Sequence, residues 1–209
     1  MNIYLPMKND LLDKGEGTIW TGGGLKEPEI VEFEEVKCAK FDGNSRLRLQ
    51  DSTLIKSLTI WTVQVWIYCT EKISSYASRI FTNYSLGDSY SNNFELVIVS
   101  NTEIFNSGAR YNINLIGNGW HHIKVTSDGQ KIYTYIDKQK MGENSTNTKL
   151  FNYDNITIGD ENGNYGWDTK FHGYMTQFKF SDKYNDKDLP LNDGKFIYIN
   201  QNNEVWAMV

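Results

Sequence analysis

The sequence has few of the residues that build zinc sites. It contains only two cysteines and three histidines among 209 residues. Two thiols are too few for a structural zinc site, and without a secretion signal we expect Cys38 and Cys69 to be buried and free. His121 and His122 are neighbours on one expected strand, so they point to opposite faces and cannot easily share one metal ion. We therefore expect both histidines to be structural.

The chain also lacks a basic excess and any long apolar run. Its formal net charge is −5, whereas a nucleic-acid-binding surface needs clustered lysine and arginine. The longest apolar run, residues 63–68, is far too short to span a bilayer, so we expect no membrane insertion. Residues 1–6 contain neither a basic region nor an apolar signal core. We expect a protein made in the cytosol without a signal peptide, with association to a virus particle as one route out of the cell.

Long amphipathic helices are also missing, and one short helical turn is expected near residues 186–189. Short strands separated by turns fill the chain instead, which is typical of a sandwich or barrel. The strongest strand, residues 59–69, is apolar on both faces and predicts a central strand covered on both sides. We expect Trp61, Trp66 and Trp120 to lie in the core. Further strands are expected within residues 29–41 (two strands), 46–49, 79–82, 94–99, 155–159, 171–180, 194–199 and 204–208.

The most recognisable pattern is a β-hairpin over residues 119–137. Its two alternating strands flank a tight turn at Asp128-Gly129. Ile123 and Val125 share one face of the first strand, as expected for one strand of a large antiparallel sheet.

Five segments have the order and spacing of a known family. They are a Phe-Asp-Gly strand and turn at 39–45, a Trp-bearing apolar strand at 61–67, a Trp-His-His strand with an Asp-Gly turn at 120–129, an Ile-Gly strand with an acidic loop at 158–162, and a Phe-x-Gly strand at 171–175. Together they resemble the concanavalin A-like lectin/glucanase superfamily, in particular laminin G-like and pentraxin-like domains. The resemblance covers residues 33–189. It implies an all-β fold, a two-sheet antiparallel jelly-roll sandwich, which in this family often binds carbohydrate or protein.

No Pro-, Gly- or Ser-rich linker divides the chain, so we expect a single jelly-roll domain over residues 1–209. Residues 1–30 are expected to form an N-terminal strand plus a loop, and the opening strand of such domains commonly pairs with the last one. Residues 190–209 are expected to add a C-terminal hairpin. Its apolar end is either tucked into the sandwich or buried by another chain.

Two polar loops, residues 83–93 and 160–168, carry the side chains expected to bind sugar. A pyranose needs a flat ring for its apolar face and amides or carboxylates for its hydroxyl groups. The resemblance implies that both loops lie at neighbouring positions on one rim. The expected carbohydrate-binding residues are Tyr84, Asp88, Tyr90, Asn92, Asn164, Tyr165, Trp167 and Asp168.

The resemblance to pentraxin-like domains also implies a calcium site between these two loops. The candidate ligands are Asp88, Asp160, Glu161 and Asn162. Ca²⁺ prefers oxygen ligands of this kind. The alternative is that these acids are simply solvated in surface turns.

The sequence does not reproduce the acid pair of a glycoside hydrolase. Hydrolases that share the implied fold carry a Glu-x-Asp-x-x-Glu arrangement on one strand, and residues 32–35 have a different spacing. A charged edge strand explains these residues better. We therefore expect no enzyme but a non-catalytic carbohydrate-binding or adhesion module, a phage or virion component that contacts host surface glycans, often as a homo-oligomer. The alternative is a virion decoration or assembly protein that uses the sandwich for protein–protein contacts, and a glycan-cleaving enzyme comes third.

Overall fold

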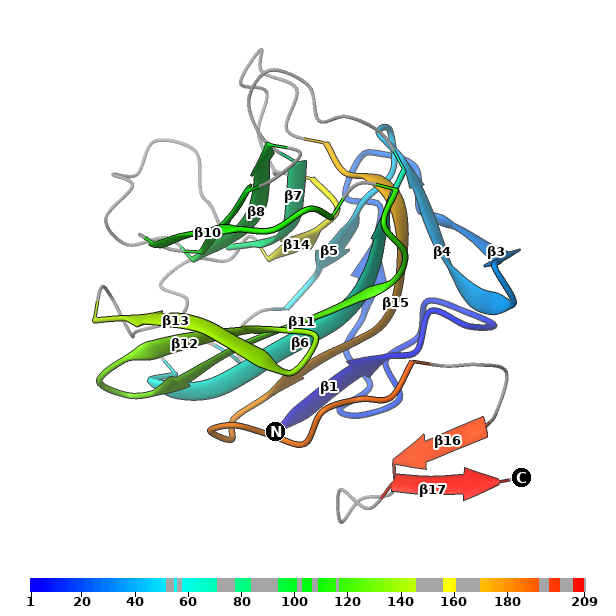
Figure 1. The fold of residues 1–209 in the computed structure, drawn as a ribbon. Coiled ribbons are helices and arrows are strands. Elements are labelled where there is room, and N and C mark those ends of the chain that lie inside the picture. Colours follow the sequence, from blue (N-terminus) through cyan, green and yellow to red (C-terminus); the bar gives the residue numbers. More distant parts are fainter. Residues whose placement is uncertain are drawn as a thin grey trace.

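The computed structural model contains two antiparallel sheets packed face to face and a separate two-stranded hairpin (Figure 1). The structure describes residues 1–51, 55, 58–70, 78–83, 94–100, 103–106, 109–115, 117–145, 156–160, 170–191, 196–199 and 205–208. The expected all-β, two-sheet antiparallel sandwich is confirmed.

Sheet A has eight strands. In spatial order they are β13 (Gln139–Asn144), β12 (Ile132–Ile136), β11 (His121–Asp128), β6 (Ile60–Cys69), β15 (His172–Ser181), β4 (Val36–Asp42) and β3 (Glu29–Phe33), with β1 (Asn2–Leu5) paired to β15. Sheet A curves around the strands of the other sheet (Figure 1). The strand with apolar residues on both faces, β6, lies near the middle of this sheet, as its sequence predicts.

Sheet B has seven shorter strands. In order they are β10 (Ala109–Asn112), β9 (Glu103–Asn106), β8 (Glu95–Ser100), β7 (Ser78–Thr82), β14 (Thr157–Ile158), β5 (Leu47–Leu49) and β2 (Trp20–Thr21). The hairpin pairs β16 (Phe196–Ile199) with β17 (Val205–Met208) and is hydrogen bonded to neither large sheet.

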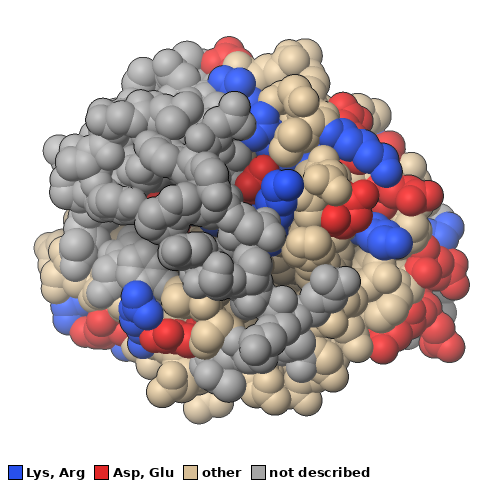
Figure 2. Space-filling model, turned by 90° about the horizontal axis from the view of Figure 1, so that it is seen from above, with Lys and Arg blue, Asp and Glu red and all other residues tan. Residues whose placement is uncertain are grey.

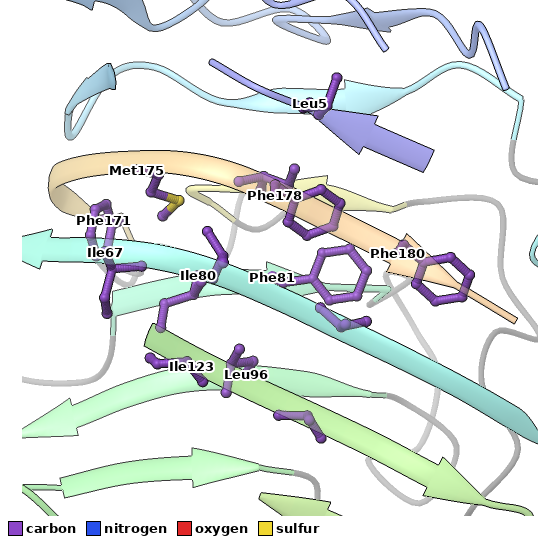
Figure 3. Packing of buried hydrophobic residues seen from close by; sticks show 14 of the residues in the cluster. Leu5, Ile67, Ile80, Phe81, Leu96, Ile123, Phe171, Met175, Phe178 and Phe180 are labelled. Atoms are coloured by element: carbon purple, nitrogen blue, oxygen red, sulfur yellow. The ribbon is translucent and has the colours of Figure 1, made fainter. Parts of the chain in front are cut away.

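The core between the sheets is rich in aromatic rings. Trp61 on β6 is fully buried and meets Phe94 edge to face at 5.1 Å between ring centroids. Phe81 on sheet B and Phe178 on sheet A face each other across the core, with centroids 5.3 Å apart (Figure 3). Such pairs add about 1 kcal/mol each beyond the area they bury. The core position expected for Trp61 is confirmed.

The hairpin of β11 and β12 has a tight turn, as its sequence predicts. Ile123 lies opposite Ile136 and Ser127 opposite Ile132, and the Asp128 N–H donates to the Lys131 carbonyl at 3.2 Å, so residues 129 and 130 form the turn. The Asp128 carboxylate accepts hydrogen bonds from the backbone N–H groups of residues 130 and 131, at 2.8 and 2.7 Å. These side-chain hydrogen bonds stabilise the turn.

Residues 182–190, which we call the strap, cross the outer face of sheet A, the face turned away from sheet B. Three side chains of β6 donate to carbonyl oxygens of the strap: Thr62 Oγ1 to Lys183 at 2.6 Å, Gln64 Nε2 to Lys187 at 2.9 Å, and Trp66 Nε1 to Leu189 at 2.8 Å. The helical turn expected over residues 186–189 is therefore wrong, because their backbone groups bind the sheet instead of one another.

Two ion pairs fasten the strap to sheet A. Lys179 on β15 binds Asp186 at 2.7 Å, with side chains 4% and 7% exposed. Lys124 on β11 binds Asp188 at 2.5 Å. Burial raises the pKa of the Asp186 carboxyl, but the hydrogen bond and charge of Lys179 outweigh it and hold this pKa below its ordinary value.

Both cysteines are buried and free, as the sequence predicts. Burial raises the pKa of each thiol to about 12, so neither is ionised at neutral pH. Within the described part of the chain, no helix has the length and apolar character needed to cross a membrane.

Candidate functional site

Almost all of the expected sugar and calcium ligands lie outside the described residues. This holds for Tyr84, Asp88, Tyr90 and Asn92 in the first loop, and for Glu161, Asn162, Asn164, Tyr165, Trp167 and Asp168 in the second. Asp160 is the one expected site residue that the structure describes. The anchors of both loops are described, however, and they show where each loop leaves the sheet.

Two hydrogen bonds between Asn83 and Phe94 hold the two ends of the first loop together. Asn83 follows β7 and is fully buried, and its side-chain oxygen accepts a hydrogen bond from the Phe94 N–H at 2.6 Å. The Asn83 N–H in turn donates to the Phe94 carbonyl at 3.2 Å. These two residues hold the ends of the loop together at the edge of the core.

The second loop is anchored at Gly159, directly after β14. Its φ is +87°, and a Cβ here would come within 2.3 Å of the Phe41 ring, so glycine is required. The Gly159 N–H donates to the Ile80 carbonyl at 3.1 Å, and its own carbonyl accepts from the Phe171 N–H at 2.9 Å. Both sheets therefore fix the start of this loop.

Asp160 is nearly buried and lies close to a cation. Burial lowers the pKa of the Arg46 guanidinium, and the charge of Asp160 opposes that shift. Arg46 also donates to the carbonyl of Gly22 at 3.0 Å, which holds it beside the acid. Among the described residues, no group of three or more His, Cys, Asp or Glu is placed to bind a metal ion.

The anchors of the two loops lie at opposite ends of one strand pair of sheet B. Strands β7 and β14 are antiparallel neighbours, with Thr82 opposite Thr157 and Phe81 opposite Ile158. The loop after β7 therefore departs from one end and the loop after β14 from the other, about 13 Å apart at roughly 3.3 Å per residue.

A row of polar residues crosses this outer face between the two loop anchors. Arg48 lies opposite Thr157, Thr157 opposite Thr82, and Thr82 opposite Glu95, on the adjacent strands β5, β14, β7 and β8. We call these four residues the polar row. Both threonines are fully buried, and Glu95 pairs with Arg79 at 3.6 Å. The Thr157 hydroxyl donates to the Asp160 carbonyl at 2.5 Å. The groups of the row that suit the hydroxyl groups of a sugar are therefore the partly exposed Arg48 guanidinium and Glu95 carboxylate.

The outer face of sheet A carries a cluster of four half-buried aromatic residues, Phe33, Tyr68, Trp120 and Tyr174. The rings of Phe33 and Tyr174 stack at 4.0 Å, and Tyr68 contacts Phe33 at 4.8 Å and Trp120 at 5.9 Å. Burial and the neighbouring Glu34 carboxylate, which accepts a hydrogen bond from Tyr68, raise the pKa of the Tyr68 hydroxyl. We call these four residues the aromatic cluster.

The expected core positions of Trp66 and Trp120 are wrong, because both indoles are only half-buried. Alternation along β6 places Trp66 and Tyr68 on the opposite face from Trp61. That alternation is the signal in the sequence that could have located the cluster.

The two adjacent histidines are structural, as expected. His121 Nδ1 lies 2.7 Å from the Asp137 carboxylate. His122 packs against Trp66 with ring centroids 5.1 Å apart, and its Nε2 lies 3.1 Å from the Gln64 side-chain oxygen. Burial lowers the pKa of His122 to about 4, so its ring is neutral at physiological pH.

On the coloured part of the surface seen in Figure 2, basic side chains are scattered among acidic ones, and acidic side chains gather at the right-hand edge. This mixed pattern agrees with the modest net charge of −5. It gives no support for a nucleic-acid-binding face, which needs clustered positive charge.

Comparison with solved structures finds the same fold in proteins of distant sequence. Domain 4 of a GH43 extracellular arabinanase from Geobacillus stearothermophilus, solved in complex with arabinotriose, is 18% identical with a TM-score of 0.65, over 87% of this chain and 92% of that one. The binding domain of Paraclostridial Mosquitocidal Protein 1 is 14% identical with a TM-score of 0.66, over 87% of this chain. Botulinum neurotoxin type C, whose cell entry depends on interaction with two ganglioside molecules, is 12% identical with a TM-score of 0.64, over 88% of this chain. The chain spans about half, 48%, of each of these two toxin chains.

No curated protein sequence matches this chain. A family match comes from residues 41–186, which fit Laminin_G_3, described as the Concanavalin A-like lectin/glucanases superfamily. This range falls within residues 33–189, where the sequence motifs resemble the same family. The chain therefore belongs to the laminin G-like branch of the concanavalin A-like lectin/glucanase superfamily.

Proposed function

We propose that this chain is a non-catalytic carbohydrate-binding module whose ligand lies on the outer face of sheet B. The observation that carries this proposal is the polar row, which crosses the sheet between the anchors of the two loops that bear Tyr84, Tyr90, Tyr165 and Trp167. The row supplies hydrogen-bonding groups, and the loops supply rings for the apolar faces of sugar units. Arabinotriose binding by the related arabinanase structure supports a glycan as the ligand.

We infer that the site binds sugar without cleaving it. Glycoside hydrolysis by the usual route needs two carboxyl groups that flank the scissile bond. In the polar row, Glu95 is the one carboxylate, and the Arg79 guanidinium lies 3.6 Å from it. The row therefore contains one carboxylate where that route needs two.

Replacing Trp167 by alanine is expected to weaken glycan binding by about tenfold or more, because a stacking ring commonly contributes over 1 kcal/mol to binding. A glycan array identifies the ligand, and calorimetry of wild type and variant then gives the two Kd values. Tyr184→Ala is the matched control, since Tyr184 is an exposed aromatic residue on the strap of sheet A. If wild type binds no glycan with or without calcium, the carbohydrate-binding proposal is rejected.

We also propose Ca²⁺ as a ligand of the loops, held by Asp88, Asp160, Glu161 and Asn162. Calcium that binds only the folded state is expected to raise the melting temperature, with roughly 2.7 kcal/mol of stabilisation at one hundred times its Kd. Thermal melting in CaCl₂, in MgCl₂ and in EDTA measures this, with Asp160→Asn as the ligand variant. An identical melting temperature of the wild type in all three conditions would count against the site.

A virion component made in the cytosol, contacting host surface glycans, is the setting we propose. The alternative, a virion assembly protein that works through protein contacts, gains support from the uncharged strands of the β16–β17 hairpin. A glycan array separates the two, since the component that contacts host glycans is expected to bind a glycan and the assembly protein is not.

A further inference from the structure

Arginine and lysine are divided between the two sheets. The chain has four arginines, and all of them lie on strands of sheet B or directly before one: Arg46 and Arg48 at β5, Arg79 on β7 and Arg110 on β10. The described strands of sheet B contain no lysine, whereas those of sheet A contain lysine and no arginine. A planar guanidinium can donate two parallel hydrogen bonds to one carboxylate, which the ammonium group of lysine cannot do. Sheet B therefore carries the cation that is suited to planar anions.

The side chains of Arg46 and Arg48 point to the outer face of sheet B. The two leucines on either side of Arg48 are fully buried in the core, so the arginines that alternate with them point away from it. Across the sheet, Arg48 lies between two threonines, Thr21 on β2 and Thr157 on β14. Arg48 is only half-buried, so its guanidinium is partly accessible at the β5 end of the polar row.

We propose that the glycan bound on the outer face of sheet B is acidic, and that Arg48 binds a carboxylate of one sugar unit beside the buried Arg46. This inference rests on the proposed function and narrows its ligand to glycans that carry carboxylate groups. In this arrangement the Arg48 guanidinium contacts the acidic unit, and the rest of the polar row lies beside the sugar units that follow.

A turn of three glycines, residues 22–24, holds the two arginines next to each other. The Nε atom of Arg46 donates to the carbonyl of Gly22 at 3.0 Å, and its Nη2 atom donates to the carbonyl of Gly23. The same turn packs against Arg48, because a Cβ on Gly23 would come within 2.9 Å of the Arg48 side chain and 3.4 Å of Arg46 Nε. Packing of this kind reduces the side-chain freedom that is lost when an anion binds.

The charges around these two arginines favour a bound anion. Arg46 is only 8% exposed. Burial lowers the pKa of its guanidinium, the charge of Asp160 opposes that shift, and the charge of Arg48 adds to it. The two guanidinium groups are therefore close enough to repel each other, and Asp160 is one carboxylate set against two cations. A sugar carboxylate bound at Arg48 relieves this repulsion.

The remaining two arginines are each matched by a carboxylate on a neighbouring strand. Arg79 lies 3.6 Å from Glu95, and Arg110 lies 3.2 Å from Glu103. Arg110 is on edge strand β10, five strand spacings from β5 and thus about 24 Å away at roughly 4.8 Å per spacing. It is the same residue type on the same sheet but far from the proposed contact, which makes it a matched control.

A glycan array with wild-type protein is the first test. The array carries glycans with uronic acid units, glycans with sialic acid units, neutral glycans and sulfated glycans. We expect every strongly bound glycan to carry a carboxylate, and the first two groups show which acidic sugar supplies it. Binding to neutral or sulfated glycans alone would overturn this inference and leave the proposed function intact. Binding to no glycan rejects the proposed function itself, and this inference with it.

Paired changes in protein and ligand then measure the contact. Calorimetry compares the bound acidic glycan with the same glycan after reduction of its carboxylate to an alcohol. Reduction is expected to weaken binding to wild type by about tenfold or more, the usual loss for a charge-assisted hydrogen bond, and to change binding to Arg48→Gln much less. Arg48→Lys keeps the charge but not the paired donors, so it is expected to recover only part of the affinity. Arg110→Gln is expected to respond to reduction as wild type does.

Two outcomes of these titrations would overturn the inference. One is equal affinity of wild type for the acidic and the reduced glycan, a comparison that does not depend on the folding of any variant. The other is an equal loss on reduction in wild type and in Arg48→Gln, with urea denaturation showing that the variant is folded. In that case another group binds the carboxylate.

Discussion

Replacing Asp186 by asparagine is expected to destabilise the fold by about 3–5 kcal/mol. The change leaves the Lys179 ammonium without its ion-pair partner, although that group is only 4% exposed. It also loosens the strap, because Asp186 belongs to the segment that crosses the outer face of sheet A. Urea denaturation at pH 7 measures the loss.

Two further variants separate the buried charge from the strap itself. Asp188→Asn removes the partner of Lys124, but Asp188 is 29% exposed, so water can partly replace it and the loss is expected to be clearly smaller. Lys179→Met combined with Asp186→Leu removes both charges and is expected to recover most of the stability. A loss below about 1 kcal/mol in Asp186→Asn would mean that the strap contributes little to the fold.

Lowering the pH from 7 to 4 is expected to cost about 3 kcal/mol of stability through His122. Burial lowers the pKa of His122 to about 4. The charge of Asp188 opposes this shift, and the charge of Lys124 adds to it. In the unfolded chain the ring titrates near its ordinary value of 6.5. Between pH 4 and pH 6.5 the unfolded state binds more protons than the folded state. The contribution of His122 to stability is therefore fully present above pH 6.5 and is lost as the pH falls towards 4.

The His122→Gln variant isolates this contribution. Its stability is expected to change much less between pH 7 and 4 than that of wild type, when urea denaturation is repeated across this range. Asp186 affects stability at lower pH than His122 does. The pKa of its carboxyl is held below the ordinary value of 3.8, so its contribution to stability is lost only as the pH falls through that lowered pKa. Parallel curves for wild type and His122→Gln would contradict the assignment.

Most of the fold could be predicted from sequence because its strands have clear apolar alternation. Residues 60–69 and the hairpin from His121 to Ile136 are the best examples. Strands β9, β10 and β13 were not predictable in this way. Glu103–Asn106 and Ala109–Asn112 are four residues long, and Gln139–Asn144 has no alternating apolar set. Pairing with a neighbouring strand, rather than local sequence, makes these segments extended.

The candidate site could be predicted only in part, because composition identifies useful side chains but does not show which face they occupy. The aromatic loops stand out in the sequence by their rings and amides. The polar row does not, since Arg48, Thr82 and Thr157 come from three separate segments and meet only in the sheet. The relative position of the two loops also depends on the antiparallel pairing of β7 with β14, which no local pattern reveals.

The edges of the two sheets have a consequence for aggregation. Edge strand β3 carries Glu29 and Glu32, β13 carries Lys140 and Glu143, β10 carries Arg110, and β2 is only two residues long. Charged or very short edges resist the addition of strands from other molecules. The β16–β17 hairpin has no such protection. Among the described strands, those of this hairpin are therefore the expected starting point for fibre-like assembly.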